Sequence, residues 1–195
     1  MRVVAGELRG RRIEGPNGDA TRPTTDKVRE AVFNALGSLG VVDGAKVVDL
    51  FAGSGALGIE AISRGALVCT FVENDRSALA TLKSNVAALG ITEKSSVITF
   101  DIAREIGAPG GGRIGDLVAH ADVVLVDPPY GFAHWPALFE VLGMCAENVV
   151  VVAETESRST IHANPPAGWK CLRSREYGRT TVGFFAREQG IAEGH

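Results

Sequence analysis

The stretch Val47-Val48-Asp49-Leu50-Phe51-Ala52-Gly53-Ser54-Gly55-Ala56-Leu57-Gly58 decides the fold of this chain. It begins as a short apolar run typical of a buried strand, and its last residues open a helix. The glycines between them let the backbone pass close to a ligand, and the amino terminus of a helix offers unpaired N–H groups. Gly53, Gly55 and Gly58 satisfy the spacing G-x-G-x-x-G. The stretch therefore predicts a strand, loop and helix that bind a nucleoside-containing ligand.

Strand and helix signals alternate downstream of this stretch. Strands that are apolar throughout and alternate with helices indicate a parallel sheet covered by helices on both faces. Upstream, an apolar stripe predicts a further helix that begins near Asp26, capped by Thr24 or Thr25. The expected strands are residues 47–51, 67–72, 97–100, 123–126 and 149–153, and the expected helices are 56–64, 76–89 and 135–145.

Both ends of the chain are expected to form antiparallel pairs. Residues 2–5 and 11–13, around Gly6 and Gly10, predict a small amino-terminal β-hairpin, and the segments 169–175 and 180–186 predict a hairpin that closes one edge of the sheet. The resulting domains are a hairpin extension over residues 1–20, an α/β domain over 21–187 and a disordered tail over 188–195. The glycine-rich segment 107–115 is expected to be a flexible loop.

The composition is that of an ordinary globular protein. The chain has 195 residues, of which 45% are hydrophobic and 22% charged. No apolar run approaches the roughly 20 residues that span a bilayer, and the first residues lack the apolar core of a signal peptide. Three widely spaced cysteines and four histidines show no disulfide or metal pattern. We expect a cytoplasmic protein that binds no metal and no membrane.

The net charge of −3 conceals two basic segments. Residues 1–12 carry four arginines against one glutamate, and residues 169–187 carry five basic residues against one glutamate. Basic ends on an acidic body can bind a polyanion although the whole protein is not basic. Ordinary solvated charge explains either cluster equally well when it is taken alone.

The acidic residues after the strands indicate which nucleoside binds. Glu73 follows the second strand about 20 residues after Gly53, where an acid can hold ribose hydroxyls. Asp49 begins the glycine loop, and its negative charge opposes a pyrophosphate but attracts an ammonium group. S-adenosylmethionine therefore suits this lining better than a dinucleotide does. Asp101 is placed to accept from an adenine amino group or, equally, to cap a helix over residues 102–106.

A second motif, Asp127-Pro128-Pro129-Tyr130, follows the apolar strand 123–126. In a parallel sheet, ligands bind outside the carboxyl ends of the strands, so this loop and the glycine loop converge. Two successive prolines lack N–H groups and leave their carbonyls free to accept hydrogen bonds. The Asp127 side chain and the Pro128 carbonyl can grip both hydrogens of an exocyclic amine, and Tyr130 can stack on the base. The motif predicts transfer of a methyl group to a nucleobase amine by positioning.

With these residues the chain resembles class I methyltransferases that carry an Asp-Pro-Pro-Tyr motif. Within them it is similar to the RsmD family of bacterial 16S rRNA (guanine-N2) methyltransferases over roughly residues 2–187. The most specific matches are residues 2–12, 22–34, 49–65, 71–73 and 127–130. The resemblance implies a Rossmann-like sheet of seven mostly parallel strands. It also implies methylation of one guanine, number 966 of 16S rRNA in that family, within the 30S subunit or an assembly intermediate, by a monomer.

The resemblance also implies roles for individual residues. Catalysis would involve Asp127, Pro128, Pro129 and Tyr130. RNA binding would involve Arg2, Arg9, Arg11, Arg12 and Arg22. His134 and Trp135 either contact RNA or pack at a helix start. The cofactor S-adenosylmethionine would be held by Thr24, Asp49, Phe51, Ala52, Gly53, Ser54, Gly55, Glu73, Asn74, Asp101 and Ile102.

Three other interpretations remain open from the sequence. A DNA adenine-N6 methyltransferase uses the same tetrapeptide but usually has a long target-recognition region, for which no segment here is long enough. A nicotinamide-dependent oxidoreductase would share the G-x-G-x-x-G spacing. A non-catalytic RNA-binding assembly factor would have no need for residues 127–130.

Overall fold

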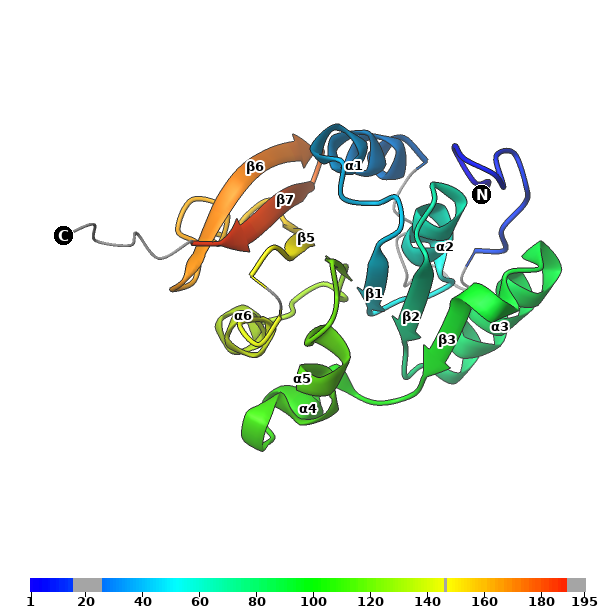
Figure 1. The fold of residues 1–195 in the computed structure, drawn as a ribbon. Coiled ribbons are helices and arrows are strands. Elements are labelled where there is room, and N and C mark those ends of the chain that lie inside the picture. Colours follow the sequence, from blue (N-terminus) through cyan, green and yellow to red (C-terminus); the bar gives the residue numbers. More distant parts are fainter. Residues whose placement is uncertain (16–25, 146, 189–195) are drawn as a thin grey trace.

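The computed structural model describes residues 1–15, 26–145 and 147–188. Helices and strands alternate along the chain (Figure 1). The elements are α1 (Asp26–Leu39), β1 (Lys46–Leu50), α2 (Ala56–Ser63), β2 (Val68–Val72), α3 (Arg76–Leu89), η1 (Thr92–Lys94), β3 (Ser95–Ile98), α4 (Ile102–Ile106), η2 (Pro109–Gly111), α5 (Gly112–Val118), β4 (Val123–Val126), α6 (Trp135–Leu142), β5 (Val150–Glu156), β6 (Trp169–Tyr177) and β7 (Thr180–Arg187).

The seven strands form one sheet in the order β3-β2-β1-β4-β5-β7-β6. The pairs among β1 to β5 are parallel, whereas β7 runs antiparallel to both β5 and β6. The order reverses at β1, so β1 and β4 are central neighbours at the topological switch point where α/β sheets bind their ligands. The predicted α/β sheet and carboxyl-terminal hairpin are both confirmed.

Two hydrophobic cores cover the two faces of the sheet, as expected for strands that are apolar throughout. In β4, Val123 and Leu125 face the core shared with α1, α2 and α3, whereas Val124 and Val126 face the core shared with α4, α5 and α6. This alternation explains the run of four buried residues in β4, since neither face of the strand is left to solvent. Among the described residues, no helix is long and apolar enough to cross a bilayer.

The predicted amino-terminal β-hairpin is wrong. Residues 1–15 form a loop with a single isolated antiparallel bridge between Arg2 and Arg12. Val3 N and Ile13 N still donate across the loop, to Arg11 O and Met1 O at 3.0 Å each. The pairing extends no further because the next backbone donors bond to α2, which lies beside the loop in Figure 1. The N–H groups of Val4 and Ala5 donate to the two carboxylate oxygens of Glu60, at 2.8 and 3.0 Å.

Glu60 is the centre of a buried charge cluster. It is fully buried, as is Arg29 of α1, whose Nε lies 3.4 Å from Glu60 Oε2. Arg64 donates from its Nε to Glu60 Oε1 at 2.8 Å, and Arg29 Nη2 donates to the Arg2 carbonyl. The cluster therefore joins the amino-terminal loop, α1 and α2.

The segment 107–115 is not the flexible loop that its glycines predicted. It contains η2 and begins α5, which Ile114 and Val118 anchor in the core. The Glu105 carboxylate accepts from the backbone N–H of Arg113 at 2.8 Å and from the Arg113 guanidinium. These bonds hold the pKa of Glu105 below its usual value. The cap at residues 24–25 predicted for α1 lies outside the described residues, and α1 itself begins at Asp26 as expected.

Replacing Glu60 tests the buried cluster. Glu60→Gln removes the charge that compensates Arg29, so we expect the free energy of unfolding to fall by about 3–5 kcal/mol. Urea denaturation at pH 7 measures this change. Glu30→Gln, on the exposed side of α1, is the matched control and should stay within about 0.5 kcal/mol of the parent. Trypsin should also cleave the Glu60 variant faster after Arg9, and a variant as stable as the parent would contradict the role of the cluster.

Candidate active site

A cavity of about 870 Å³ lies at the carboxyl ends of β1, β2, β4 and β5, and we call it the carboxyl-edge cavity. Its size is within the range of sites for small ligands and cofactors, roughly 300–1,000 Å³. Among the predicted site residues, the structure brings to its wall Asp49, Phe51, Ala52, Gly53, Ser54, Glu73, Asn74, Asp101, Ile102, Asp127, Pro128, Pro129 and Tyr130. Gly55 does not line it, and Thr24 and Arg22 lie outside the described residues.

The loop between β1 and α2 is shaped by close packing. Gly55 has φ +84°, and a Cβ on Gly58 would overlap the ring of Phe71 and the sulfur of Cys69 in β2. Gly58 therefore lets α2 pack closely against β2, the role of the third glycine in this spacing. Phe51 also adopts a left-handed conformation, with φ +65°, an uncommon choice for a residue with a side chain. The backbone turns sharply here and opens toward the cavity.

Asp49 is buried in the central strand at the base of this loop. It is 1% exposed, and its Oδ2 accepts from the backbone N–H of Gly58 at 2.9 Å. Burial raises the pKa of Asp49 to about 7, and the negative charge of Glu73 adds to the increase. Among the described residues, Asp49 Oδ1 has no hydrogen-bond partner. A buried acceptor without a partner is costly, and it faces a cavity that can supply a donor.

Glu73 holds the wall of the cavity together. Its Oε2 accepts from Gly53 N at 2.7 Å, and its Oε1 accepts from Asn74 N and Asp75 N, both at 2.8 Å. An ionised carboxylate offers about four acceptor positions, so these three hydrogen bonds leave room for one more donor. Glu73 therefore links the loops that follow β1 and β2 while it lines the cavity.

Asp101 adopts the helix-capping position that the sequence left open. Its Oδ1 accepts from Ala103 N at 2.9 Å at the start of α4, and its Oδ2 lies 3.7 Å from Arg104 Nε. The same residue lines the cavity beside Phe100 and Ile102. The capping role is confirmed, and the adenine-binding role stays a prediction.

Residues 127–131 cross the mouth of the cavity after β4. Tyr130 is 56% exposed, and Pro129 O accepts from Phe132 N at 3.3 Å. Within the described residues, no hydrogen bond uses the Pro128 carbonyl. Asp127 is partly buried between this loop and the sheet.

An aromatic cluster forms the apolar wall next to this motif. The Phe132 ring contacts the rings of Phe51 and Trp135 edge-on, each at 5.2 Å between centroids. Trp135 is buried at the start of α6, so the packing alternative is confirmed for it. His134 precedes α6, and its ring lies 5.6 Å from that of Phe132.

The sequence interpretation missed the contribution of β5. Its carboxyl end and the residues just after it complete the cavity, and Glu156 Oε1 accepts from Gly131 N at 2.8 Å. Glu156 thereby holds the end of the motif loop. The rule that ligands lie at the carboxyl ends of parallel strands could have found it, since the strand preceding Glu156 was predicted. The missed wall residues are Glu154, Thr155, Glu156, Arg158 and Ser159.

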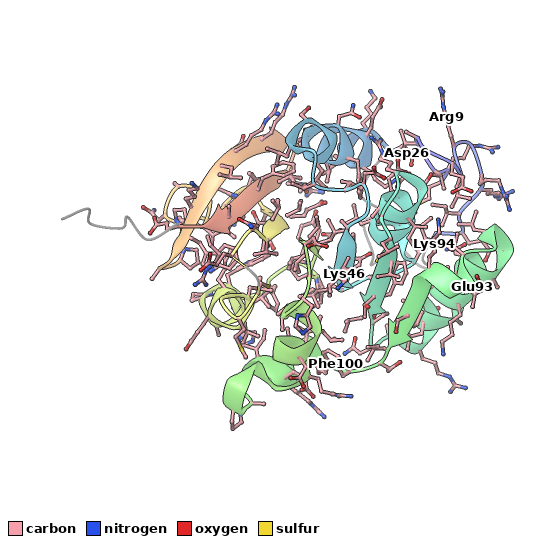
Figure 2. All side chains as sticks on the ribbon, in the orientation of Figure 1. Arg9, Asp26, Lys46, Glu93, Lys94 and Phe100 are labelled. Carbon is pink, nitrogen blue, oxygen red and sulfur yellow. The ribbon has the colours of Figure 1, made fainter. Side chains whose placement is uncertain are left out.

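The predicted RNA-binding arginines lie on the surface of the amino-terminal loop. Arg9 points away from the body of the protein in Figure 2. Arg2 Nη1 donates to Gly10 O and Arg11 Nη2 donates to Ala88 O, both at 2.8 Å, so these two side chains also fasten the loop. Arg12 is exposed. The groups are basic and accessible, and RNA binding stays a prediction.

The comparisons with known proteins agree with this architecture. The family described as Conserved hypothetical protein 95 matches residues 1–186. YlbH of Bacillus subtilis is 36% identical over 96% of this chain and 99% of its own length, and ribosomal RNA small subunit methyltransferase D of Escherichia coli K12 is 32% identical over 96% and 90%. The solved structure of yhhF from Escherichia coli is 31% identical, with a TM-score of 0.79 over 96% of this chain and 98% of that one.

The sheet order and the cavity at its switch point define the class, an α/β Rossmann-like methyltransferase fold. Within that class, the chain belongs to the Conserved hypothetical protein 95 family, which includes ribosomal RNA small subunit methyltransferase D. The family predicted from the sequence is confirmed.

The raised pKa of Asp49 predicts how stability depends on pH. The folded state keeps the Asp49 proton up to about pH 7, whereas the unfolded chain releases it near 3.8. This group therefore lowers the free energy of unfolding as pH rises from about 4 to 7, by up to about 4 kcal/mol. Asp49→Asn should remove that decrease and be more stable than the parent at pH 8.

Urea denaturation of both proteins between pH 5 and pH 8 measures this effect. The exposed Asp116→Asn is the control, and it should keep the pH dependence of the parent. If the free energies of unfolding of the parent and of Asp49→Asn differ by the same amount at every pH in this range, Asp49 titrates in the folded protein as it does in the unfolded chain, and the prediction is wrong.

Proposed function

We propose that this protein transfers a methyl group from S-adenosylmethionine to the N2 amine of a guanine in 16S rRNA, on the small subunit or an assembly intermediate. The observation that carries the proposal is the convergence of Asp49 and Asp127 in one cavity. Curated relatives over nearly the whole chain are named as ribosomal RNA small subunit methyltransferases, which supports rRNA as the substrate. The same relatives support the bacterial cytoplasm as the location.

The carboxyl-edge cavity fits S-adenosylmethionine. The unpartnered, buried Asp49 Oδ1 suits the ammonium group of the methionine part. Ser54 and Ala56 line the cavity at the start of α2, and their backbone N–H groups, which donate to none of the described residues, suit the methionine carboxylate. The remaining acceptor position of Glu73 suits a ribose hydroxyl, and Asp101 with Ile102 suits the adenine end. When bound, this cofactor supplies an electrophilic methyl group on a sulfonium.

The residues after β4 are arranged to hold the acceptor. The Asp127 carboxylate and the Pro128 carbonyl are two acceptors next to each other, as the two hydrogens of an exocyclic amine require. Bonds to both hydrogens orient the nitrogen lone pair, which is otherwise delocalised into the ring. The exposed Tyr130 offers its face for stacking on the base.

The chemistry then depends mainly on positioning and on exclusion of water. The rings of Phe51, Phe132 and Trp135 form a dry wall beside Asp127. No strong base is needed, because the amine becomes far more acidic once it has gained the methyl group. Asp127 holds the departing proton until solvent takes it. The guanine has to leave its stack to reach this point.

The arginines of the amino-terminal loop are placed to bind RNA phosphates. Arg9, Arg11 and Arg12 are exposed on a loop that the Glu60 cluster fixes to the body of the protein. Such contacts position a nucleic acid without reading its sequence. We propose that the protein acts as a monomer and that Arg22 and Thr24, outside the described residues, complete the RNA and cofactor sites.

Asp127→Ala tests the proposed reaction. We expect the methyl-transfer rate to fall at least about 100-fold, because the amine loses one of its two acceptors and its orientation. The assay is tritium transfer from labelled cofactor to small subunits from a strain lacking the enzyme, with mass spectrometry of the methylated nucleotide. Asp116→Ala, at an exposed site on α5, should transfer at the parent rate. Transfer to free DNA in preference to small subunits would instead indicate an adenine methyltransferase.

Glu156 is predicted to be a positioning residue. Glu156→Ala frees the Gly131 N–H and loosens the motif loop, so kcat should fall about 10- to 100-fold, whereas the Kd of the cofactor by calorimetry should not change. Glu156→Gln keeps an oxygen that accepts from Gly131 and should restore most of kcat. Equal losses in both variants would contradict positioning through this hydrogen bond.

A further inference from the structure

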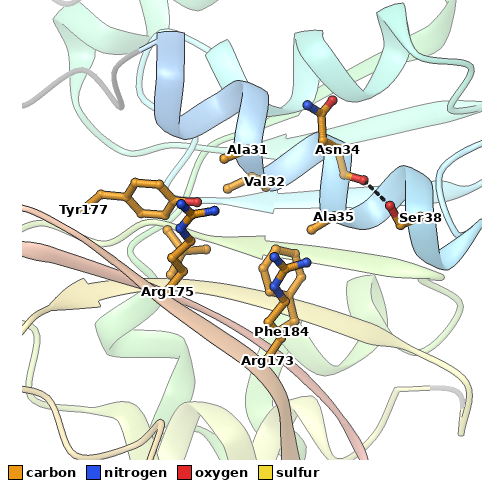
Figure 3. A pocket seen from close by; sticks show the side chains of 10 residues that line it. Ala31, Val32, Asn34, Ala35, Ser38, Arg173, Arg175, Tyr177 and Phe184 are labelled. Carbon is orange, nitrogen blue, oxygen red and sulfur yellow. Dashed lines mark hydrogen bonds between the residues drawn. The ribbon is translucent and has the colours of Figure 1, made fainter.

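A second, smaller hollow lies between α1 and the β6–β7 hairpin, and we call it the α1–β6 groove (Figure 3). Its volume is about 240 Å³, and it shares no lining residue with the carboxyl-edge cavity. Nothing in the reaction proposed above uses it. The groove is lined by Ala31, Val32, Asn34, Ala35, Ser38, Arg173, Arg175, Tyr177, Val182 and Phe184.

The strand period places the basic wall of this groove. Arg173, Arg175 and Tyr177 alternate along β6 and therefore share one face of the sheet. In register, Arg173 lies beside Phe184 and Arg175 beside Val182, both of which belong to the core on the α1 side. The three side chains therefore project toward α1, as Figure 3 shows.

The opposite wall comes from one side of α1. Ala31 and Ala35 lie one helical turn apart, and their small side chains leave the space that forms the groove. Asn34 and Ser38 lie along the same side and add polar groups. Asn34 Oδ1 accepts from Arg64 Nη1 at 3.1 Å, so its amide N–H groups are left to donate. Ser38 Oγ donates to the Asn34 backbone carbonyl at 2.9 Å, and the Asn34 amide points away from Arg173 and Arg175 in Figure 3. The donors that face the groove therefore come from β6.

The charge in the groove is positive and uncompensated. Its lining contains two guanidinium groups and no carboxylate. Among the described residues, neither Arg173 nor Arg175 has a carboxylate within 4.0 Å. Arg175 lies 5.6 Å from the centre of the Tyr177 ring, a cation–π contact that restrains it. The carboxyl-edge cavity has the opposite character, since aspartates and glutamates line it.

We propose that the α1–β6 groove binds a backbone phosphate of the RNA substrate. The proposal rests on the proposed function and extends it. Guanidinium groups match phosphate oxygens with paired N–H donors, and the groove is smaller than the roughly 300 Å³ at which small-molecule pockets begin. It therefore suits a group presented by a larger molecule. An anionic strand also needs cations near an acidic cavity, and this groove supplies two.

The strand β7 connects the groove with the carboxyl-edge cavity. Thr180 lines the cavity, whereas Val182 and Phe184, two and four residues further along the strand, line the groove. Tyr177 pairs with Thr180, which pairs with Glu156 of β5. Adjacent strands lie about 4.8 Å apart, so Tyr177 of the groove and Glu156 of the cavity are about 10 Å apart across the sheet. Asp127 follows β4, three strand spacings from Arg175, or about 14 Å. An RNA whose guanine enters the cavity can place a neighbouring phosphate in the groove.

The test compares two pairs of charge-removing variants. Arg173→Gln with Arg175→Gln removes the charge of the groove. Lys46→Gln with Lys170→Gln is the control, because it removes the same charge from two exposed lysines, near the amino ends of β1 and β6, that do not line the groove. Figure 2 labels Lys46. The probe is a labelled single-stranded RNA of mixed sequence, and fluorescence anisotropy gives Kd between 50 and 200 mM salt.

We expect the arginine pair to raise Kd about tenfold at 100 mM salt and to reduce the slope of log K against log salt by about 1. The lysine pair should match the parent. Ala35→Asp introduces a carboxylate from the α1 wall and should also weaken binding. Arg175→Lys keeps the charge but loses the paired donors, so it should bind more weakly than the parent and more tightly than the arginine pair. Kd for S-adenosylmethionine should be unchanged in all variants.

If the arginine pair and Ala35→Asp both keep the RNA affinity and the salt slope of the parent, the proposal is overturned, and an acidic protein partner is then the alternative occupant of the groove. Equal weakening by the arginine and lysine pairs would overturn it too, because the effect would then be one of net charge. Methyl transfer to small subunits is measured separately. If the parent protein transfers no methyl group, the proposed reaction is refuted. If the arginine pair nevertheless weakens RNA binding, the proposal that the α1–β6 groove binds a phosphate is still supported.

Discussion

The contacts of the buried Glu60 carboxylate fix the positions of the amino-terminal loop, α1 and α2 relative to one another. It compensates the buried Arg29, accepts from Arg64 and accepts two backbone N–H groups of the amino-terminal loop. A buried charge without its partners is strongly destabilising. The folded state therefore needs all the partners of Glu60 in place together. The consequence is that a loop with a single β-bridge has a fixed position. Met1 at its start lines the carboxyl-edge cavity, and its arginines lie on the adjoining surface.

Opposite charges are kept apart on this scaffold. The cavity collects carboxylates because it lies where the loops after four strands converge, and those carboxylates suit an ammonium, ribose hydroxyls and an amine. Positive groups are placed beyond the rim, on the amino-terminal loop and on one face of β6. In the proposed reaction, this arrangement would attract an RNA strand to the rim and admit a neutral base to the cavity. The separation allows a protein with a net charge of −3 to keep two basic surfaces.

Local sequence predicted much of the fold and part of the site. Helix α3 has the predicted bounds, and Asp49, Glu73 and Asp127 line one cavity because each follows or ends a strand that could be recognised. The failures depend on contacts distant in sequence. The amino-terminal pairing stops at one bridge because Glu60 accepts from the N–H groups of Val4 and Ala5, and α5 forms despite its glycines because Ile114 and Val118 are buried. The register of β6 against β7 brings Arg173 and Arg175 toward α1. It depends on pairing between the strands of the folded sheet, so the local sequence did not predict it.

Both tryptophans of the chain lie in the core on the α4 side and contact the Phe139 ring, but of the two only Trp135 also lines the carboxyl-edge cavity. Trp169 is buried, and its indole N–H donates to the Phe139 carbonyl at 3.1 Å, away from the cavity wall. Trp135 lines the cavity and packs edge-on against Phe132. Emission from Trp135 therefore follows the polarity of the cavity, whereas emission from Trp169 follows the integrity of the core. Filling of the site and loosening of the fold can thus be distinguished by light, without a label.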